Sequence, residues 1–296
     1  MQFNTRIIYT LCTTWMLFLV WGGVAHGAPC DPNASDVCVL TLPSKADPCV
    51  GGACEVTCDL NVASGTSSTT LDVTYDDKGT GTTADDEITF EGTVEDGDAF
   101  ECVFPYGTGT DQLVPLDSTV IVTGTDEPDD IDIQTVFRAF IAAVGESNDR
   151  VRCDEEIDAV SLEMGDGDDW VSCEVDECAY IDLGNDDDSA IYTGPALSPG
   201  GGGNPCSGFT GAPADEILTV SGEGDDCVIG SDQGRDDWFG GSGSDEFDSR
   251  GDGGTTPFSD DADGGTGFDY CLDGDITAIN CEAFKPSPLN CPSYTP

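Results

Sequence analysis

The side chains that could do chemistry in this chain are aspartates in short, glycine-containing loops. A four-residue pattern recurs, in which two acidic or polar residues are followed by one variable and one apolar residue. It occupies residues 85–88, 148–151, 168–171, 225–228, 236–239 and 244–247. Carboxylates and the carbonyl groups of glycine-rich turns are oxygen donors, which hard cations such as Ca²⁺ prefer. The pattern therefore indicates bound cations.

The same pattern has a fixed period in the middle of the chain. Asp129, Asp149, Asp169 and Asp188 follow one another at steps of 20, 20 and 19 residues. Positions two and four residues after each aspartate form two series of apolar residues or cysteine: Ile131, Val151, Val171 and Ala190, then Ile133, Cys153, Cys173 and Tyr192. Such alternation predicts strands.

Strands that recur in one orientation stack as parallel coils, about 4.8 Å apart. The sequence therefore predicts a parallel β-solenoid with an acidic turn in every coil. The alternative is a β-sandwich with acidic loops, although sandwich turns require no fixed spacing between glycine and aspartate.

The overall charge excludes some classes of binding partner. The 296 residues include 59 Asp and Glu but only 9 Lys and Arg, for a formal net charge of −50. Binding to nucleic-acid phosphates or to anionic lipid needs the opposite sign, so both are excluded as partners. The 38 glycines, 15 cysteines and 38% hydrophobic residues are not typical of a disordered acidic tail.

Residues 1–28 have the features of a secretory signal peptide. Arg6 precedes an apolar run at residues 7–20, and small residues follow at 25, 27 and 28. An uncleaved anchor helix is the alternative, and Pro29 before Cys30 argues against a lipoprotein. Cleavage removes His26, the only histidine, and one arginine, which leaves 8 − 59 = −51. A chain without imidazole has no Ser-His-Asp system, no Cys-His system and no His-ligated zinc.

Cleavage also removes Cys12 and leaves 14 cysteines. An even number in an exported chain predicts disulfides, up to seven. Cys153 and Cys173 fall in one predicted column, where a direct disulfide, burial as small apolar residues, or pairing elsewhere all remain open. Cys271 and Cys281 are the closest C-terminal pair and would join the last coil to the tail.

Residues 240–248 carry a more specific signal. They fit every fixed position of the nonapeptide G-G-x-G-x-D-x-U-x, in which U is apolar, and residues 221–229, 264–272 and 231–239 fit it in part. The chain thus resembles the RTX, or haemolysin-type, calcium-binding repeat proteins. It differs from them in being cysteine-rich and in having an N-terminal signal.

The resemblance implies a parallel β-roll in which stacked turns share Ca²⁺. It implies that aspartate carboxylates ligate the metal while glycines shape the loops. The metal-site residues it implies are Asp226, Asp236, Asp245, Asp269, Gly222, Gly224, Gly241 and Gly243, followed by Asp169 and Asp188 and then by Asp149 and Asp129.

These signals predict an all-β chain: a parallel β-roll or β-solenoid with calcium-binding Gly-Asp turns, a disulfide-stapled N-terminal region and a C-terminal cap. The expected divisions are a signal peptide at 1–28, a cysteine-rich β region or cap at 29–110, the calcium-binding solenoid at 111–275 and the cap at 276–296. Strands are expected at 70–75, 87–91, 118–123 and 136–144, with a short helix as the alternative for 136–144. Residues 199–205 are expected to form an extruded loop or a hinge, and residues 249–263 an insertion.

The expected function is that of a secreted, calcium-binding repeat protein without catalysis, stabilised by Ca²⁺. Its role would be structural or interactive, with an unknown partner at the cell surface or in the extracellular matrix. The alternative is a calcium-dependent β-helix enzyme acting on extracellular polysaccharide. Only eight Lys and Arg remain after cleavage, and the acidic surface would repel a polyanionic substrate.

Overall fold

The computed structural model describes residues 25–26, 37–41, 54–61, 65–76, 78, 86–106, 113, 118–193, 216–230, 235–248, 261–272, 277–281 and 291. These residues form an all-β protein, and none of them is helical. Within this part of the chain there is accordingly no helix long and apolar enough to cross a membrane.

The strands fall into an N-terminal group and a longer series. The N-terminal strands are β1 (Ala25–His26), β2 (Cys38–Thr41), β3 (Cys54–Asp59), β4 (Thr69–Asp76), β5 (Glu87–Thr93) and β6 (Ala99–Pro105). The series that follows is β7 (Ser118–Thr123), β8 (Asp129–Gln134), β9 (Ala139–Glu146), β10 (Arg150–Asp166), β11 (Trp170–Asp182), β12 (Ser189–Thr193), β13 (Glu216–Val220), β14 (Cys227–Ile229), β15 (Arg235–Phe239), β16 (Ser242–Gly243), β17 (Glu246–Asp248), β18 (Asp261–Asp263), β19 (Thr266–Gly267), β20 (Tyr270–Leu272) and β21 (Thr277–Ile279).

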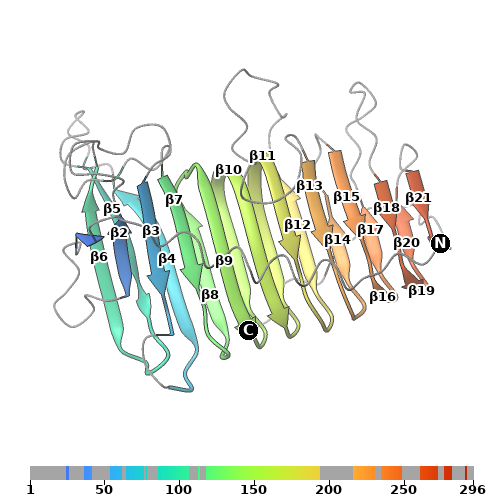
Figure 1. The fold of residues 1–296 in the computed structure, drawn as a ribbon, viewed down its shortest axis with the longest axis horizontal. Helices are drawn as coiled ribbons and strands as arrows, with labels where there is room; N and C mark the ends of the chain where they lie inside the picture. The colour runs from blue at the N-terminus through green and yellow to red at the C-terminus, as the bar shows by residue number, and fades with distance from the viewer. Residues whose placement is uncertain are drawn as a thin grey trace.

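Most of these strands belong to two parallel ladders (Figure 1). The first ladder runs β3, β7, β9, β10, β11, β13, β15, β18 and β21. The second runs β4, β8, β10, β11, β12, β14, β17 and β20. The long strands β10 and β11 contribute to both ladders, and their pairing shifts register between Cys153 and Ala159. The chain therefore passes alternately from one ladder to the other.

Antiparallel pairing is confined to the N-terminal strands. β2 pairs with β1 and β3, and β5 pairs with β4 and β6. However, β3 and β4 also pair in parallel with β7 and β8. The strands of residues 54–76 therefore continue into the same ladders as the strands that begin at residue 118, across the boundary expected at 110/111.

The inward side chains of successive strands form columns, as the period predicts. One column on the second ladder is fully or almost fully buried: Leu71, Ile131, Val151, Val171, Ala190, Val228, Phe247 and Cys271. Near the C-terminal end the stacked rings of Trp238 and Phe247, 5.2 Å between centroids, fill the core. Apolar alternation along each strand thus produces one continuous core.

The expected strands at 70–75, 87–91 and 118–123 are present as β4, β5 and β7, and the apolar run at 136–144 contains most of β9. The expected insertion at 249–263 extends too far, because its last three residues form β18 and join the first ladder. Within the expected cap, β21 adds one more strand to that ladder. The glycine-rich run at 199–205 and the predicted signal peptide, apart from β1, lie outside the described residues.

Four disulfides join described cysteines: Cys38–Cys58, Cys153–Cys173, Cys227–Cys291 and Cys271–Cys281. Of the three alternatives open for Cys153 and Cys173, the direct disulfide is the one that forms, and the predicted staple between Cys271 and Cys281 is confirmed. Disulfides of this number are compatible with an extracellular location.

Candidate metal site in the aspartate turns

From β7 onward, each passage from the first ladder to the second ends on a buried aspartate. These seven residues, here called the inner row, are Asp129, Asp149, Asp169, Asp188, Asp226, Asp245 and Asp269. Each is at most 2% exposed. They occupy equivalent positions because the residues that follow them pair in register along the second ladder.

Backbone hydrogen bonds connect the inner row from end to end. The N–H of Asp149 donates to Oδ1 of Asp169 at 2.7 Å, and the N–H of Asp169 donates to Oδ1 of Asp188 at 2.8 Å. The same bond links every other successive pair at 2.8–3.0 Å. The carboxylates from Asp149 to Asp269 are thus each held in one orientation by the preceding repeat.

The second carboxylate oxygen is the unusual feature of the row. Oδ2 is buried without a hydrogen-bond partner in five of these residues: Asp149, Asp169, Asp188, Asp226 and Asp245. A buried oxygen acceptor without a donor or a cation is energetically costly. These atoms are therefore positioned to bind either a proton or a metal ion.

Asp129 shows what a fully satisfied member of the row looks like. The Thr125 N–H donates to its Oδ2 at 2.8 Å, and the Thr125 hydroxyl donates to its Oδ1 at 3.1 Å. The Thr69 hydroxyl also donates to Oδ1. Because hydroxyl and amide donors already occupy both oxygens, this position has the least capacity for a cation.

Burial dominates the electrostatics of the inner row. It raises the pKa of Asp149, Asp226 and Asp245 to about 7, that of Asp169 to about 8 and that of Asp188 to about 10. Neighbouring carboxylates raise these pKa values further, while the backbone N–H donors oppose the shift. A bound cation would supply the charge compensation that these carboxylates lack.

Glycines shape the turns that precede the inner row. Gly222, Gly224, Gly241 and Gly243, all implied by the nonapeptide pattern, have positive φ angles of 101°, 141°, 92° and 152°. Space requires glycine as well, since a Cβ on Gly222 would lie 1.7 Å from the Gly184 carbonyl oxygen. The turns stack too closely for any side chain at these positions.

The turn carbonyls are partly used by this stacking. The N–H of Asn185 donates to the Gly165 carbonyl at 2.9 Å, and the N–H of Ser242 donates to the Gly222 carbonyl at 2.8 Å. A carbonyl oxygen has a second lone pair, so it can still face a cation. No group of three or more His, Cys, Asp or Glu side chains converges as a metal cluster in the described residues. A cation here would therefore depend on backbone carbonyls as well as carboxylates.

A second row of side chains lies at the exposed side of each turn and was not anticipated from the sequence. This outer row consists of Asn148, Asp168, Asp187 and Asp225. Each accepts a hydrogen bond at Oδ1 from the backbone N–H one repeat further along the chain, at 2.7–3.2 Å. The recurring pair of polar residues before each strand could have predicted this row. The second residue of each pair is the inner-row aspartate, and the first is the outer-row residue.

Asp236 does not join the other predicted metal-site residues. It lies in β15 of the first ladder, in register with Ile217, where neighbouring repeats have apolar residues. It is 3% exposed. Burial raises the pKa of the Tyr192 hydroxyl, and the charge of nearby Asp236 raises that pKa further. The Gly-x-Asp-x-Trp spacing at residues 234–238 resembled the turn pattern, but its aspartate is separate from the inner row.

Comparison with known proteins does not identify a function, so the function is inferred from the geometry of the site. No protein-family model, no curated protein and no solved structure matches the chain.

Proposed function

We propose that this chain is a secreted calcium-binding β-solenoid with a structural or interaction role, and that Ca²⁺ stabilises its folded state. The observation that carries the proposal is the set of five inner-row carboxylates whose Oδ2 atoms are buried without a hydrogen-bond donor. Such atoms match the oxygen preference of Ca²⁺. A divalent cation would also offset the repulsion between carboxylates stacked at strand spacing.

The fold supports this reading. Two parallel ladders connected alternately by one chain are the pairing pattern of a solenoid, in which equivalent residues form columns. Disulfides and a strongly acidic composition suit a protein that works outside the cell. Secretion itself follows from the predicted signal peptide.

The geometry restricts where calcium would bind. The sites would lie along the inner row from Asp149 to Asp245, at one edge of the repeats. In this proposal the glycine-rich turns contribute carbonyl oxygens and the aspartates contribute carboxylates, while Asp129 stays metal-free. Asp236, at a different place in the repeat, is not a ligand in this row.

A calcium titration of the mature protein tests the proposal. Titration is followed by circular dichroism, by fluorescence of Trp170 and Trp238, and by calorimetry. Ca²⁺ is expected to raise the unfolding midpoint, because it binds the folded state only. The absence of any response up to millimolar calcium would contradict the proposal.

Matched variants locate the site. Asp188→Asn and Asp226→Asn each remove one carboxylate with an unpartnered Oδ2, and each is expected to weaken calcium binding by about tenfold or more. Asp129→Asn is the control, since that carboxylate already has donors on both oxygens. Equal loss in all three variants would argue for a non-specific charge effect.

A further inference from the structure

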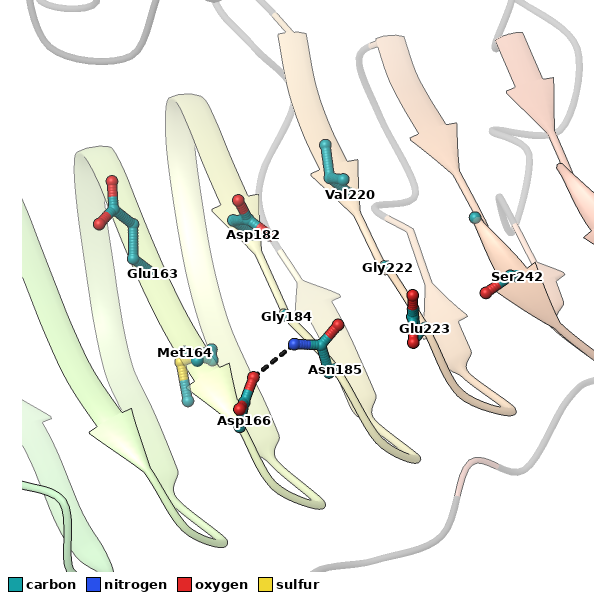
Figure 2. A pocket seen from close by; sticks show the side chains of 12 residues that line it. Glu163, Met164, Asp166, Asp182, Gly184, Asn185, Val220, Gly222, Glu223 and Ser242 are labelled. Atoms are coloured by element: carbon teal, nitrogen blue, oxygen red, sulfur yellow. Dashed lines mark hydrogen bonds between the residues drawn. The ribbon is translucent and has the colours of Figure 1, made fainter. Parts of the chain in front are cut away.

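A groove of about 570 Å³ runs across the turns on the outer side of the molecule (Figure 2). It crosses the ends of β10, β11 and β13 and the turns that follow them. None of the inner-row aspartates lines it. The groove therefore shares turn glycines with the candidate calcium site but none of its carboxylates.

Stacked glycines form the floor of the groove. Gly165, Gly184, Gly222 and Gly241 all line it. A Cβ on Gly184 would lie 1.6 Å from the Gly165 carbonyl oxygen, so no larger residue fits there. Because only glycine fits at these positions, the floor of the groove has no side chains along successive repeats.

The first bank of the groove carries two adjacent carboxylates. Glu163 and Asp182 are register partners on neighbouring strands, and Val220 continues this bank. Burial raises the pKa of Asp182, and the charge of Glu163 raises it further. The Tyr180 hydroxyl and the Gly184 N–H hold Asp182 in place. Like charges side by side in a sheet are unfavourable unless a cation lies between them.

The second bank is formed by the turns. The Asn185 side chain donates to Oδ1 of Asp166, as the dashed line in Figure 2 shows. Single β-bridges join Asp166 to Asn185, Asn185 to Glu223 and Glu223 to Ser242. Two further carboxylates are thus fixed opposite the first bank. No Lys, Arg or His is among the described residues that line the groove.

We propose that this groove binds a linear aliphatic polyamine. Its carboxylates lie on two banks across successive repeats, and they include no converging group of three that would suit a compact metal ion. A polyamine carries ammonium groups separated by three or four methylenes. The three-methylene distance is close to one strand spacing of about 4.8 Å, and the four-methylene distance is longer. Its methylenes would lie over the glycine floor and against Val220.

Isothermal titration with spermine tests the proposal. The full mature protein is titrated both with saturating calcium and with a chelator, so that loss of calcium binding and loss of polyamine binding are separate results. Spermine is expected to bind in both conditions, more tightly than putrescine, and binding is expected to weaken as salt is added.

Charge-matched variants distinguish the groove from the general acidity of the chain. Glu163→Gln/Asp182→Asn is expected to weaken spermine binding at least about tenfold. Asp98→Asn/Glu101→Gln removes two exposed carboxylates outside the groove, and is expected to change the affinity less than about twofold. Val220→Lys keeps every carboxylate and places an ammonium group in the groove, so it should also weaken binding.

Three results would overturn the proposal. Equal affinities in the two double variants would show that spermine responds only to net charge. Displacement of spermine by calcium, together with loss of one calcium site in Glu163→Gln/Asp182→Asn, would make the groove a metal site. Undetectable spermine binding at low ionic strength would exclude polyamines altogether.

Discussion

At the scale of single residues, five inner-row aspartates combine burial, a fixed orientation and an unpartnered oxygen: Asp149, Asp169, Asp188, Asp226 and Asp245. Outer-row carboxylates at the same turns are solvated, and their hydrogen bonds from backbone N–H groups only hold neighbouring turns in register. The inner row is different because a buried carboxylate must be neutralised by a proton or by a cation. If the proposed calcium binding holds, this competition makes the row sensitive to both pH and calcium.

The predicted pH dependence follows from the raised pKa values. Asp188, for example, has a pKa of about 10 in the folded protein against an ordinary value of 3.8. Between these values the folded state holds more protons than the unfolded state, so stability is greatest at low pH and falls as pH rises. In chelator, urea unfolding is expected to show a steady loss of stability from pH 5.5 to 9.

Under the proposed calcium binding, Ca²⁺ is expected to remove most of this decline, because the metal would replace the proton at the same oxygen. Asp169→Asn/Asp188→Asn should also flatten it, since two of the titrating groups are gone. A calcium-free protein that is equally stable at pH 5.5 and pH 9 would show that the row is not protonated in the folded state.

The equivalence of inner-row residues was largely predictable from the sequence, because constant spacing and apolar alternation define columns wherever repeats are uninterrupted. Asp129 to Asp188 were found in this way, as was the shared column of Cys153 and Cys173, whose direct disulfide was only one of the alternatives left open. Asp236 was misplaced because spacing between a glycine and an aspartate does not reveal which side of the repeat they occupy. The orphan Oδ2 atoms were not predictable, since they depend on the orientation imposed by the preceding repeat.

At the scale of elements, the glycine turns decide whether the ladders can stack. Alternating apolar residues predicted the strands, but parallel partners such as β3 with β7 lie about 60 residues apart in sequence, so local patterns cannot pair them. The strands alone do not determine this stacking. The glycine turns connect the two ladders in so little space that the backbones of neighbouring turns come into contact.

Two glycine variants separate the energetic cost of a positive φ angle from the cost of steric crowding. Gly97 has a φ of 84°, but its Cβ would meet only Ser67 Oγ at 3.8 Å, so Gly97→Ala is expected to cost about 1–2 kcal/mol. Gly184 has a φ of 102° and also lacks space, so Gly184→Ala is expected to cost about 3–5 kcal/mol. Chemical unfolding in saturating calcium measures both, and similar losses would refute close stacking at Gly184.

At the scale of the whole molecule, the two ladders form one long core in which each repeat contacts its neighbours. Such molecules open preferentially from their ends, and links between repeats therefore matter more than isolated contacts. The Cys227–Cys291 disulfide links β14 to the C-terminal segment, with a sequence separation of 64. Cys291 also packs with Cys227, Ile229 and the partly buried Ile191.

Removing this link should loosen a defined part of the molecule. Cys227→Ser/Cys291→Ser is expected to lower the free energy of unfolding by about 4 kcal/mol from the lost loop constraint. Hydrogen exchange should accelerate in β12, β14 and β17, where the disulfide and Cys291 stabilise the outer side of the second ladder. Exchange in β4 and β8 should stay slow because their neighbours are unchanged.

Cys271→Ser/Cys281→Ser is the control, with a sequence separation of only 10 between the two cysteines, and it should affect β20 most. Uniform acceleration from β3 to β21 would mean that the chain unfolds as one cooperative unit, because end-to-end opening requires a gradient of protection along the ladders.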